Sequence, residues 1–169
     1  AFLEIKGRKP TAGESVVFNA MLATLVEHGM TPMVIAARLT YLGAPESLQG
    51  AVAAGILGMG TTFAGTAEGS ARILQDAITN DTTHSDLPAL AEQIVARHMA
   101  SKTSIPGIGH PLHKPIDPRT PRLFQLAEEN GLSGKYVELM KLVASAAERA
   151  LNKPGQLPVN ATGALGALS

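Results

Sequence analysis

The chain has 169 residues, no cysteine, and a formal net charge of zero when histidine is counted as neutral. The zero net charge argues against broad electrostatic attraction to nucleic acid or membranes, so any recognition of an anion must be local. The lack of cysteine excludes disulfides and thiolate chemistry and fits a cytoplasmic protein, and 45% hydrophobic with 17% charged residues is typical of a globular domain.

Signals for helix starts and stops recur along the chain. Thr11-Ala12-Gly13-Glu14 is a capping box, and the residues after it are apolar at helical spacing. Thr31-Pro32 predicts another start, because proline is favoured in the first helical turn. The predicted helices cover residues 11–28, 31–43, 45–59, 66–78, 86–100, 118–130 and 133–152, and a further one begins at 160. No segment alternates apolar and polar residues as a strand does, so the expected fold class is all-α.

The predicted helix from Pro45 to Met59 is unusually rich in glycine and alanine. A glycine inside a helix costs roughly 1 kcal/mol relative to alanine, so its repeated use predicts close contact with another backbone. That contact could lie inside the domain or across a dimer interface, and the sequence leaves both open. Both chain ends fall within predicted elements, which indicates the middle part of a larger protein.

Residues 102–119 carry the most distinctive chemistry in the sequence. Four prolines and two glycines exclude a regular helix or a central strand here, and the apolar residues between them predict a loop that packs against the core. Asp117-Pro118 predicts a helix N-cap, which would occupy the carboxylate with backbone amides and leave Lys102, Lys114 and Arg119 unneutralised. The loop therefore predicts an anion-binding site. The alternative is a helix connector with surface charges.

Two further features of this loop bear on a ligand. Gly107 and Gly109 carry no side chain, so a ligand could lie directly against the backbone. His110 and His113 could form a pair of metal ligands, but no cysteine or carboxylate set completes a site. We therefore expect no metal.

These residues resemble the central loop of the citrate synthase family. Gly107-Ile108-Gly109-His110, followed by Lys114 and Asp117-Pro118-Arg119, is similar to the family's glycine-glycine-histidine, lysine and aspartate-proline-arginine motif. Glu27-His28-Gly29-Met30 is similar to its acidic-histidine-glycine segment, and Pro158-Val159-Asn160 to the segment that carries its catalytic aspartate. The resemblance covers nearly the whole chain and implies a multi-helical, citrate synthase-like fold, here as a fragment of a longer chain.

The resemblance implies carbon–carbon bond chemistry on a coenzyme A thioester. His28 and His110 would act as the catalytic residues that hold oxygen atoms of oxaloacetate or of a citryl group. Arg119 would pair with a carboxylate, a role that its planar guanidinium suits. Asn160 and Thr162 would complete the residues that bind this small-molecule substrate.

Coenzyme A, as part of the acyl-CoA substrate, is the cofactor that the resemblance implies. Its adenine would lie against the backbone of residues 105–109, and a lysine of the loop would approach its phosphates. The implied cofactor-binding residues are Lys102, Ile105, Pro106, Gly107, Ile108, Gly109 and Lys114. The family also implies a homodimer or a higher homo-oligomer. Residues 1–100 would then be large-domain helices that include the dimer interface, and residues 101–169 the substrate loop and part of the small domain.

Two departures from the family pattern decide between its activities. Thr62-Phe63-Ala64-Gly65 replaces a proline-leucine-histidine-glycine loop, and the alanine cannot donate a hydrogen bond to an enolate as that histidine does. Citryl-CoA lyases and the citrate-synthase-like module of ATP-citrate lyase resemble this chain better, since they have a phenylalanine-glycine loop there. Thr162 replaces the catalytic aspartate, and a threonine hydroxyl is a poor base at neutral pH.

The leading hypothesis is therefore a citryl-CoA lyase-like enzyme, which cleaves citryl-CoA to acetyl-CoA and oxaloacetate. A non-catalytic member of the family that binds coenzyme A or a dicarboxylate is the second. Condensation of the citrate synthase type is the third. Glu68 is the alternative carboxylate nearest in sequence to the altered loop, and no role is assigned to it.

Overall fold

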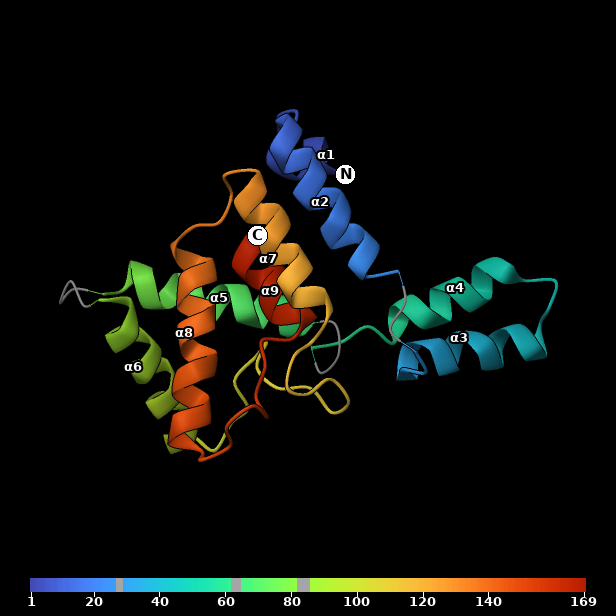
Figure 1. The fold of residues 1–169 in the computed structure, drawn as a ribbon. Helices are drawn as coiled ribbons and strands as arrows, with labels where there is room; N and C mark the ends of the chain where they lie inside the picture. Colours follow the sequence, from blue (N-terminus) through green and yellow to red (C-terminus); the bar gives the residue numbers. More distant parts are fainter. Residues whose placement is uncertain (27–28, 62–64, 82–85) are drawn as a thin grey trace. The chain divides into compact units, whose positions relative to one another are not determined.

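The computed structural model describes residues 1–26, 29–61, 65–81 and 86–169. In these ranges every regular element is an α-helix (Figure 1), and the extended backbone is limited to one isolated antiparallel bridge between Ile108 and Val159. The helices are α1 (Phe2–Lys6), α2 (Ala12–Thr24), α3 (Pro32–Gly43), α4 (Leu48–Leu57), α5 (Gly65–Thr79), α6 (Leu87–Ala100), α7 (Arg119–Glu129), α8 (Lys135–Ala150) and α9 (Ala161–Leu168). The all-α prediction is confirmed.

The side-chain caps that the sequence indicated are present. The backbone N–H of Thr11 donates to Glu14 Oε2 at 2.8 Å, and the Glu14 N–H donates to Thr11 Oγ1 at 3.2 Å, so the capping box is complete. Thr31 Oγ1 accepts from the N–H of Val34 at the start of α3. These bonds satisfy amide groups that have no partner within the helix, and they explain why the starts of α2 and α3 were predictable.

Two predicted helix boundaries are wrong. Helix α2 ends at Thr24, earlier than expected, and the predicted last residues, Glu27 and His28, lie outside the described part of the chain. Helix α4 begins at Leu48 rather than at Pro45. Proline marks the region of a helix start through its fixed φ, but it does not fix the first helical residue.

The chain divides into two compact units, and the larger one contains residues 1–24 and 66–169. In it, α6 packs along α8, while α9 packs against both α7 and α8. The core of this unit is aliphatic with one aromatic ring; its largest members are Leu74, Leu90, Ile94, Val95, Leu123, Phe124, Val137, Leu139, Met140, Val143 and Leu165. The predicted site residues other than His28 lie in residues 101–119 and 158–163, which belong to this unit.

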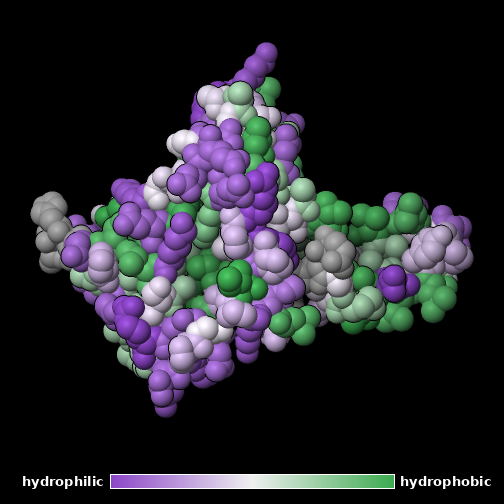
Figure 2. Space-filling view, viewed as in Figure 1, coloured by the Kyte–Doolittle hydropathy of each residue, from purple (hydrophilic) through white to green (hydrophobic). Residues whose placement is uncertain are grey.

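The smaller unit, residues 25–65, is a hairpin of α3 and α4. A Cβ atom added to Gly55 would lie 3.3 Å from the Cβ of Ala37, and one added to Gly58 would lie 3.5 Å from the Cα of Met33. These α4 glycines therefore face α3, which places one close backbone contact inside the hairpin. Both helices also carry exposed apolar side chains, which colour this unit green in Figure 2: Ile35, Leu39, Leu42, Leu48, Val52, Ile56 and Leu57.

Candidate functional site

The predicted loop is joined to the segment before α9 by backbone hydrogen bonds. The N–H of Gly109 donates to the carbonyl of Pro158 at 2.7 Å, and the N–H of Asn160 donates to the carbonyl of Gly107 at 2.9 Å. Between them lies the bridge of Ile108 with Val159. Residues 107–109 and 158–160 are far apart in sequence, so this short ladder is what fixes the loop beside the start of α9.

Gly107 is required by packing against α9. Its φ is +85°, a left-handed conformation that side chains rarely adopt, and a Cβ here would lie 2.5 Å from the Cα of Gly163. The same Cβ would also lie 2.5 Å from Ser70 Oγ. The expectation that the missing side chain leaves room for a ligand is therefore wrong for Gly107, because the protein itself fills that space.

Asn160 connects the loop to α9 through its side chain. Its Nδ2 donates to the carbonyl of Gly109 at 2.7 Å, and its Oδ1 accepts from the N–H of Gly163 at 3.1 Å as the N-cap of α9. The hydroxyl of Thr162 lies 2.7 Å from the same Oδ1 and donates to it. Asn160 and Thr162, predicted from the family pattern, thus form one hydrogen-bonded group with the backbone next to His110.

Asp117 forms the second link between the loop and α9. Its side chain is completely buried and pairs with Arg119 through two bonds, Nε to Oδ1 at 2.9 Å and Nη2 to Oδ2 at 2.7 Å. The N–H of Arg119, the first residue of α7, donates to Oδ1 at 3.1 Å, and the N–H of Ala161 donates to Oδ2 at 2.9 Å. The N-cap residue of α7 is Pro118, so the prediction of Asp117 as the N-cap is wrong by one position. The prediction that Arg119 is unneutralised by its own chain is therefore wrong, because Asp117 pairs with the arginine while it also accepts from these backbone amides.

The environment of Asp117 lowers its pKa. Burial alone opposes the charged form and raises the pKa, but the hydrogen bonds from the Arg119 side chain and from the Arg119 and Ala161 amides outweigh it. The attraction of the Arg119 charge acts in the same direction. The carboxylate is thus held ionised, and Arg119 is held in a fixed orientation beside α9.

His110 is oriented by the backbone that follows it. Its Nδ1 accepts hydrogen bonds from the N–H of Leu112 at 3.1 Å and from the N–H of His113 at 3.0 Å. Two donors at Nδ1 place the proton of the neutral ring on Nε2, which can donate to an acceptor atom of a ligand. The ring of His113 lies beside it, with centroids 4.4 Å apart. The other predicted catalytic histidine, His28, lies outside the described residues.

A cavity of about 360 Å³ opens at the base of the loop. It is lined by residues of the loop, of the C-terminal ends of α6 and α8, and of the segment after α8: His98, Met99, Lys102, Thr103, Ser104, Ile105, Ile108, Ala147, Leu151 and Leu157. Three predicted cofactor-binding residues, Lys102, Ile105 and Ile108, are among them. Lys102 has a φ of +54° because it closes the C-terminus of α6: its N–H donates to the carbonyl of Met99, and the N–H of Thr103 donates to the carbonyl of His98.

His98 helps to shape this cavity. Its Nδ1 lies 3.0 Å from Thr103 Oγ1, and the N–H of Thr103 donates to the carbonyl of His98. Burial, with a smaller effect of the Arg97 charge, lowers the pKa of His98, against an opposing hydrogen bond to the backbone of Ser104. This ring therefore serves as a partly buried connection between α6 and the loop.

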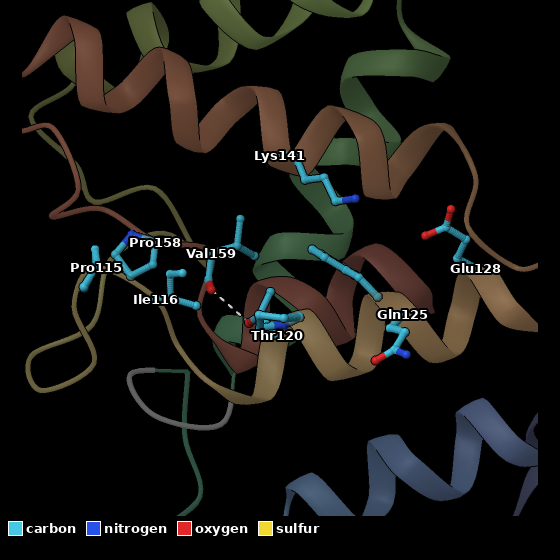
Figure 3. A pocket seen from close by; sticks show the side chains of 10 residues that line it. Pro115, Ile116, Thr120, Gln125, Glu128, Lys141, Pro158 and Val159 are labelled. Atoms are coloured by element: carbon cyan, nitrogen blue, oxygen red, sulfur yellow. Dashed lines mark hydrogen bonds between the residues drawn. The ribbon is translucent and has the colours of Figure 1, made fainter.

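The other side of the loop faces a groove of about 450 Å³ (Figure 3). Thr120 Oγ1 donates to the carbonyl of Val159 at 2.9 Å, and Lys141 Nζ lies 5.0 Å from the centre of the Phe124 ring. Proline and aliphatic side chains from the loop and from the segment before α9 form much of the surface: Pro115, Ile116, Pro121, Pro158 and Val159. None of the predicted site residues that the structure describes lines this groove.

The structure thus brings together most of the predicted residues of the larger unit. Pro106 packs against α5, where a Cβ on Gly69 would lie 3.1 Å from it. Lys114 is exposed and lines neither of the two cavities. Glu68 pairs with Arg72 at 2.6 Å on the surface of α5. Thr62, Phe63 and Ala64 lie outside the described residues.

Sequence reasoning missed the roles of Asp117 and Ser70. Asp117 was assigned to capping alone, although an aspartate two residues before an arginine can also reach the guanidinium. Ser70 is completely buried, donates to the carbonyl of Thr66 at 2.7 Å, and supports both Gly107 and α9. Nothing in the local sequence marks Ser70. Within the described ranges, no group of three or more histidine, aspartate or glutamate side chains is arranged to hold a metal ion.

Comparison with known proteins places these residues in context. A family model described as the C-terminal domain of citrate synthase matches residues 1–167. Citryl-CoA lyase from Hydrogenobacter thermophilus superposes with a TM-score of 0.86 at 33% identity, over 99% of this chain and 62% of that one. ATP citrate lyase from Methanothrix soehngenii, solved with citrate and coenzyme A, gives a TM-score of 0.78 at 22% identity, over 96% of this chain and 25% of that one.

Among curated proteins, probable ATP-citrate synthase of Dictyostelium discoideum is 31% identical over 165 residues. The match covers 95% of this chain but 25% of that protein, so the chain spans about a quarter of the curated relative. In the described ranges, none of the helices is both long enough and apolar enough to cross a membrane.

Proposed function

Because the chain belongs to the citrate synthase family, we propose that the protein cleaves citryl-CoA to acetyl-CoA and oxaloacetate. The observation that carries this proposal is a single hydrogen-bonded group. It joins the 107–110 loop, the Asp117–Arg119 pair and the Asn160–Thr162 segment. These are the positions that the family resemblance implies for substrate binding. The 33% identity to a citryl-CoA lyase supports the lyase reaction in particular.

The cavity at the base of the loop supports coenzyme A binding. Its volume of about 360 Å³ falls within the range of small-molecule sites, and it is lined mainly by aliphatic side chains with a few polar groups. We propose that the adenine packs against Ile105 and Ile108 and that Lys102, which is exposed, approaches the phosphates. The sequence left Lys102 and Lys114 as alternatives for this role. Lys102 lines the cavity, which favours Lys102 over Lys114.

The acid end of the substrate would meet His110 and Arg119. The Nε2–H of His110 can donate to a carbonyl or carboxylate oxygen, because Nδ1 is occupied by two backbone donors. Arg119 is oriented by Asp117, which reduces the conformational entropy that carboxylate binding would cost. In the cleavage, the bond between the carbinol carbon and the acetyl arm breaks. The hydroxyl loses its proton, and the enolate of acetyl-CoA gains one.

One observation favours a second candidate, a non-catalytic member that binds coenzyme A. The Thr162 hydroxyl already donates its proton to Asn160 Oδ1 at 2.7 Å, and an amide oxygen cannot store a proton at neutral pH. Thr162 is thus unsuited to the proton transfer that the family's aspartate performs. Lyase activity then requires a proton donor other than Thr162.

We propose that the α3–α4 hairpin associates with a second copy of this chain. Its exposed apolar residues lie on both helices, and an exposed apolar face of this extent is typical of an interface. A homodimer is what the family resemblance implies for this segment. Replacement of Leu39 and Ile56, which are 63% and 61% exposed, by glutamate should convert an oligomer to monomers in analytical ultracentrifugation.

Incubation of the full-length protein with citryl-CoA tests the proposed reaction. Release of acetyl-CoA and oxaloacetate is expected. Chromatography would measure the acetyl-CoA, and a coupled reduction would measure the oxaloacetate. His110→Ala should slow this release by about 10²-fold or more, because it removes a donor to the charge that develops on oxygen. Coenzyme A binding by calorimetry without cleavage would support the non-catalytic candidate instead.

A further inference from the structure

We propose that Thr162 recognises a hydroxyl group of the bound acid by accepting a hydrogen bond from it. The inference rests on the proposed function, under which a small carboxylic acid would lie beside Thr162, and it adds the residue that binds the hydroxyl of that acid. Thr162 would make the site selective for a hydroxy acid over an acid with the same carboxylates but no hydroxyl.

The argument begins with the orientation of the Asn160 amide. Its Nδ2 contacts the carbonyl oxygen of Gly109, which can only accept, and its Oδ1 contacts the N–H of Gly163, which can only donate. Both backbone partners have fixed polarity, so the two ends of the amide cannot be exchanged. The atom 2.7 Å from the Thr162 hydroxyl is therefore an acceptor, and Thr162 must be the donor in that bond.

The donor role of Thr162 decides what its oxygen can offer to a ligand. A hydroxyl has one proton and two lone pairs, and here the proton is used by Asn160. Thr162 is partly exposed, and the two lone pairs of its oxygen take no part in the bond to Asn160. Only a ligand group with an O–H or N–H can bind there. A carboxylate or a ketone cannot.

An acceptor at Thr162 distinguishes acids that carry a hydroxyl from acids that do not. The citryl group carries a tertiary hydroxyl, whereas oxaloacetate at neutral pH carries a ketone and two carboxylates and offers no O–H donor in its keto form. An aspartate at this position would accept hydrogen bonds as well, but its charge would also repel the carboxylates of the acid. Thr162 accepts from the hydroxyl without that repulsion. His110 complements it, since its Nδ1 accepts two backbone hydrogen bonds and the ring proton is therefore on Nε2, a donor.

Calorimetry with two acids that differ in one group tests this inference. Citrate and tricarballylate carry the same three carboxylates, and only citrate has the hydroxyl. The full-length wild-type protein should bind citrate about five- to tenfold more tightly, the worth of a hydrogen bond to a group that is otherwise unpaired. Thr162→Val, which keeps the shape, should abolish the preference, and Thr162→Ser should keep it.

Each outcome of this experiment counts for or against the inference. Equal affinity of the wild-type protein for the two acids, or binding of neither, would overturn it without any variant. If the Thr162→Val variant still prefers citrate over tricarballylate, another residue binds the citrate hydroxyl and the inference is wrong. If Thr162→Val weakens coenzyme A binding instead, the group that donates to Thr162 is an amide of the pantetheine arm. That result also overturns the inference. Absence of citryl-CoA cleavage alongside a Thr162-dependent preference would refute the proposed reaction and leave this inference standing.

Discussion

Replacing Asp117 with alanine is expected to destabilise the protein by about 3 kcal/mol. Asp117 is completely buried, and its carboxylate is bonded to the Arg119 guanidinium and to the amides of Arg119 and Ala161. Breaking a buried ion pair by removing one partner typically costs about 3–5 kcal/mol, because the other charge stays behind. The Arg119 side chain is 27% exposed and can recover some hydration, which places the expected loss at the lower end of that range.

Urea denaturation followed by circular dichroism measures this loss, and the chain offers a matched control. Glu68 and Arg72 also form a carboxylate–guanidinium pair at 2.6 Å, but their side chains are 70% and 67% exposed. Glu68→Ala should therefore change the free energy of unfolding by less than about 1 kcal/mol. If Asp117→Ala costs no more than Glu68→Ala, the claim that Asp117 holds the loop and α9 together is refuted.

Three further predictions concern the same loop. Gly107→Ala should lower the free energy of unfolding by at least about 2 kcal/mol, because the φ of this residue is +85° and the added Cβ would collide with Gly163. Urea denaturation measures this loss, and an unchanged unfolding midpoint would contradict the described packing. Because the pKa of Asp117 is lowered from 3.8, its stabilisation is complete above that pH and is lost as the pH falls through the folded-state value. The stability difference between wild type and Asp117→Asn should thus be constant above about pH 5 and shrink below about pH 4, whereas a difference independent of pH would argue against the ionised pair. Lys102→Met should weaken coenzyme A binding about fivefold or more in calorimetry, and Lys114→Met should have a smaller effect. A larger effect of Lys114→Met would indicate that the phosphates bind at Lys114 instead.

The fold class and the helix starts could be predicted because they depend on local chemistry. The capping box at Thr11 and the Thr31-Pro32 start act within a few residues, so the sequence pattern carries the whole signal. The start of α4 was missed because the turn before it, with the N–H of Ser47 bonded to the carbonyl of Ala44, has no strong sequence signature. Family resemblance supplied the multi-helical, citrate synthase-like architecture that the TM-score of 0.86 supports.

The site was harder to predict because its geometry depends on residues far apart in sequence. The Gly107–Gly163 contact and the bond from Ala161 to Asp117 each join segments separated by more than forty residues, which no local pattern specifies. Arg119 was expected to be unneutralised because an N-cap was assumed to use the whole carboxylate, yet each oxygen of Asp117 accepts from both a backbone amide and the guanidinium. Gly107 was likewise expected to leave room for a ligand, but the space beside it is filled by Gly163 and Ser70.

The most direct test of the central claim is a crystal structure of the full-length protein with coenzyme A bound. The adenine is predicted to lie against Ile105 and Ile108 in the cavity at the base of the loop, with a phosphate near Lys102 and the thiol end directed toward His110. Coenzyme A bound at another surface, with this cavity filled only by solvent, would contradict the account.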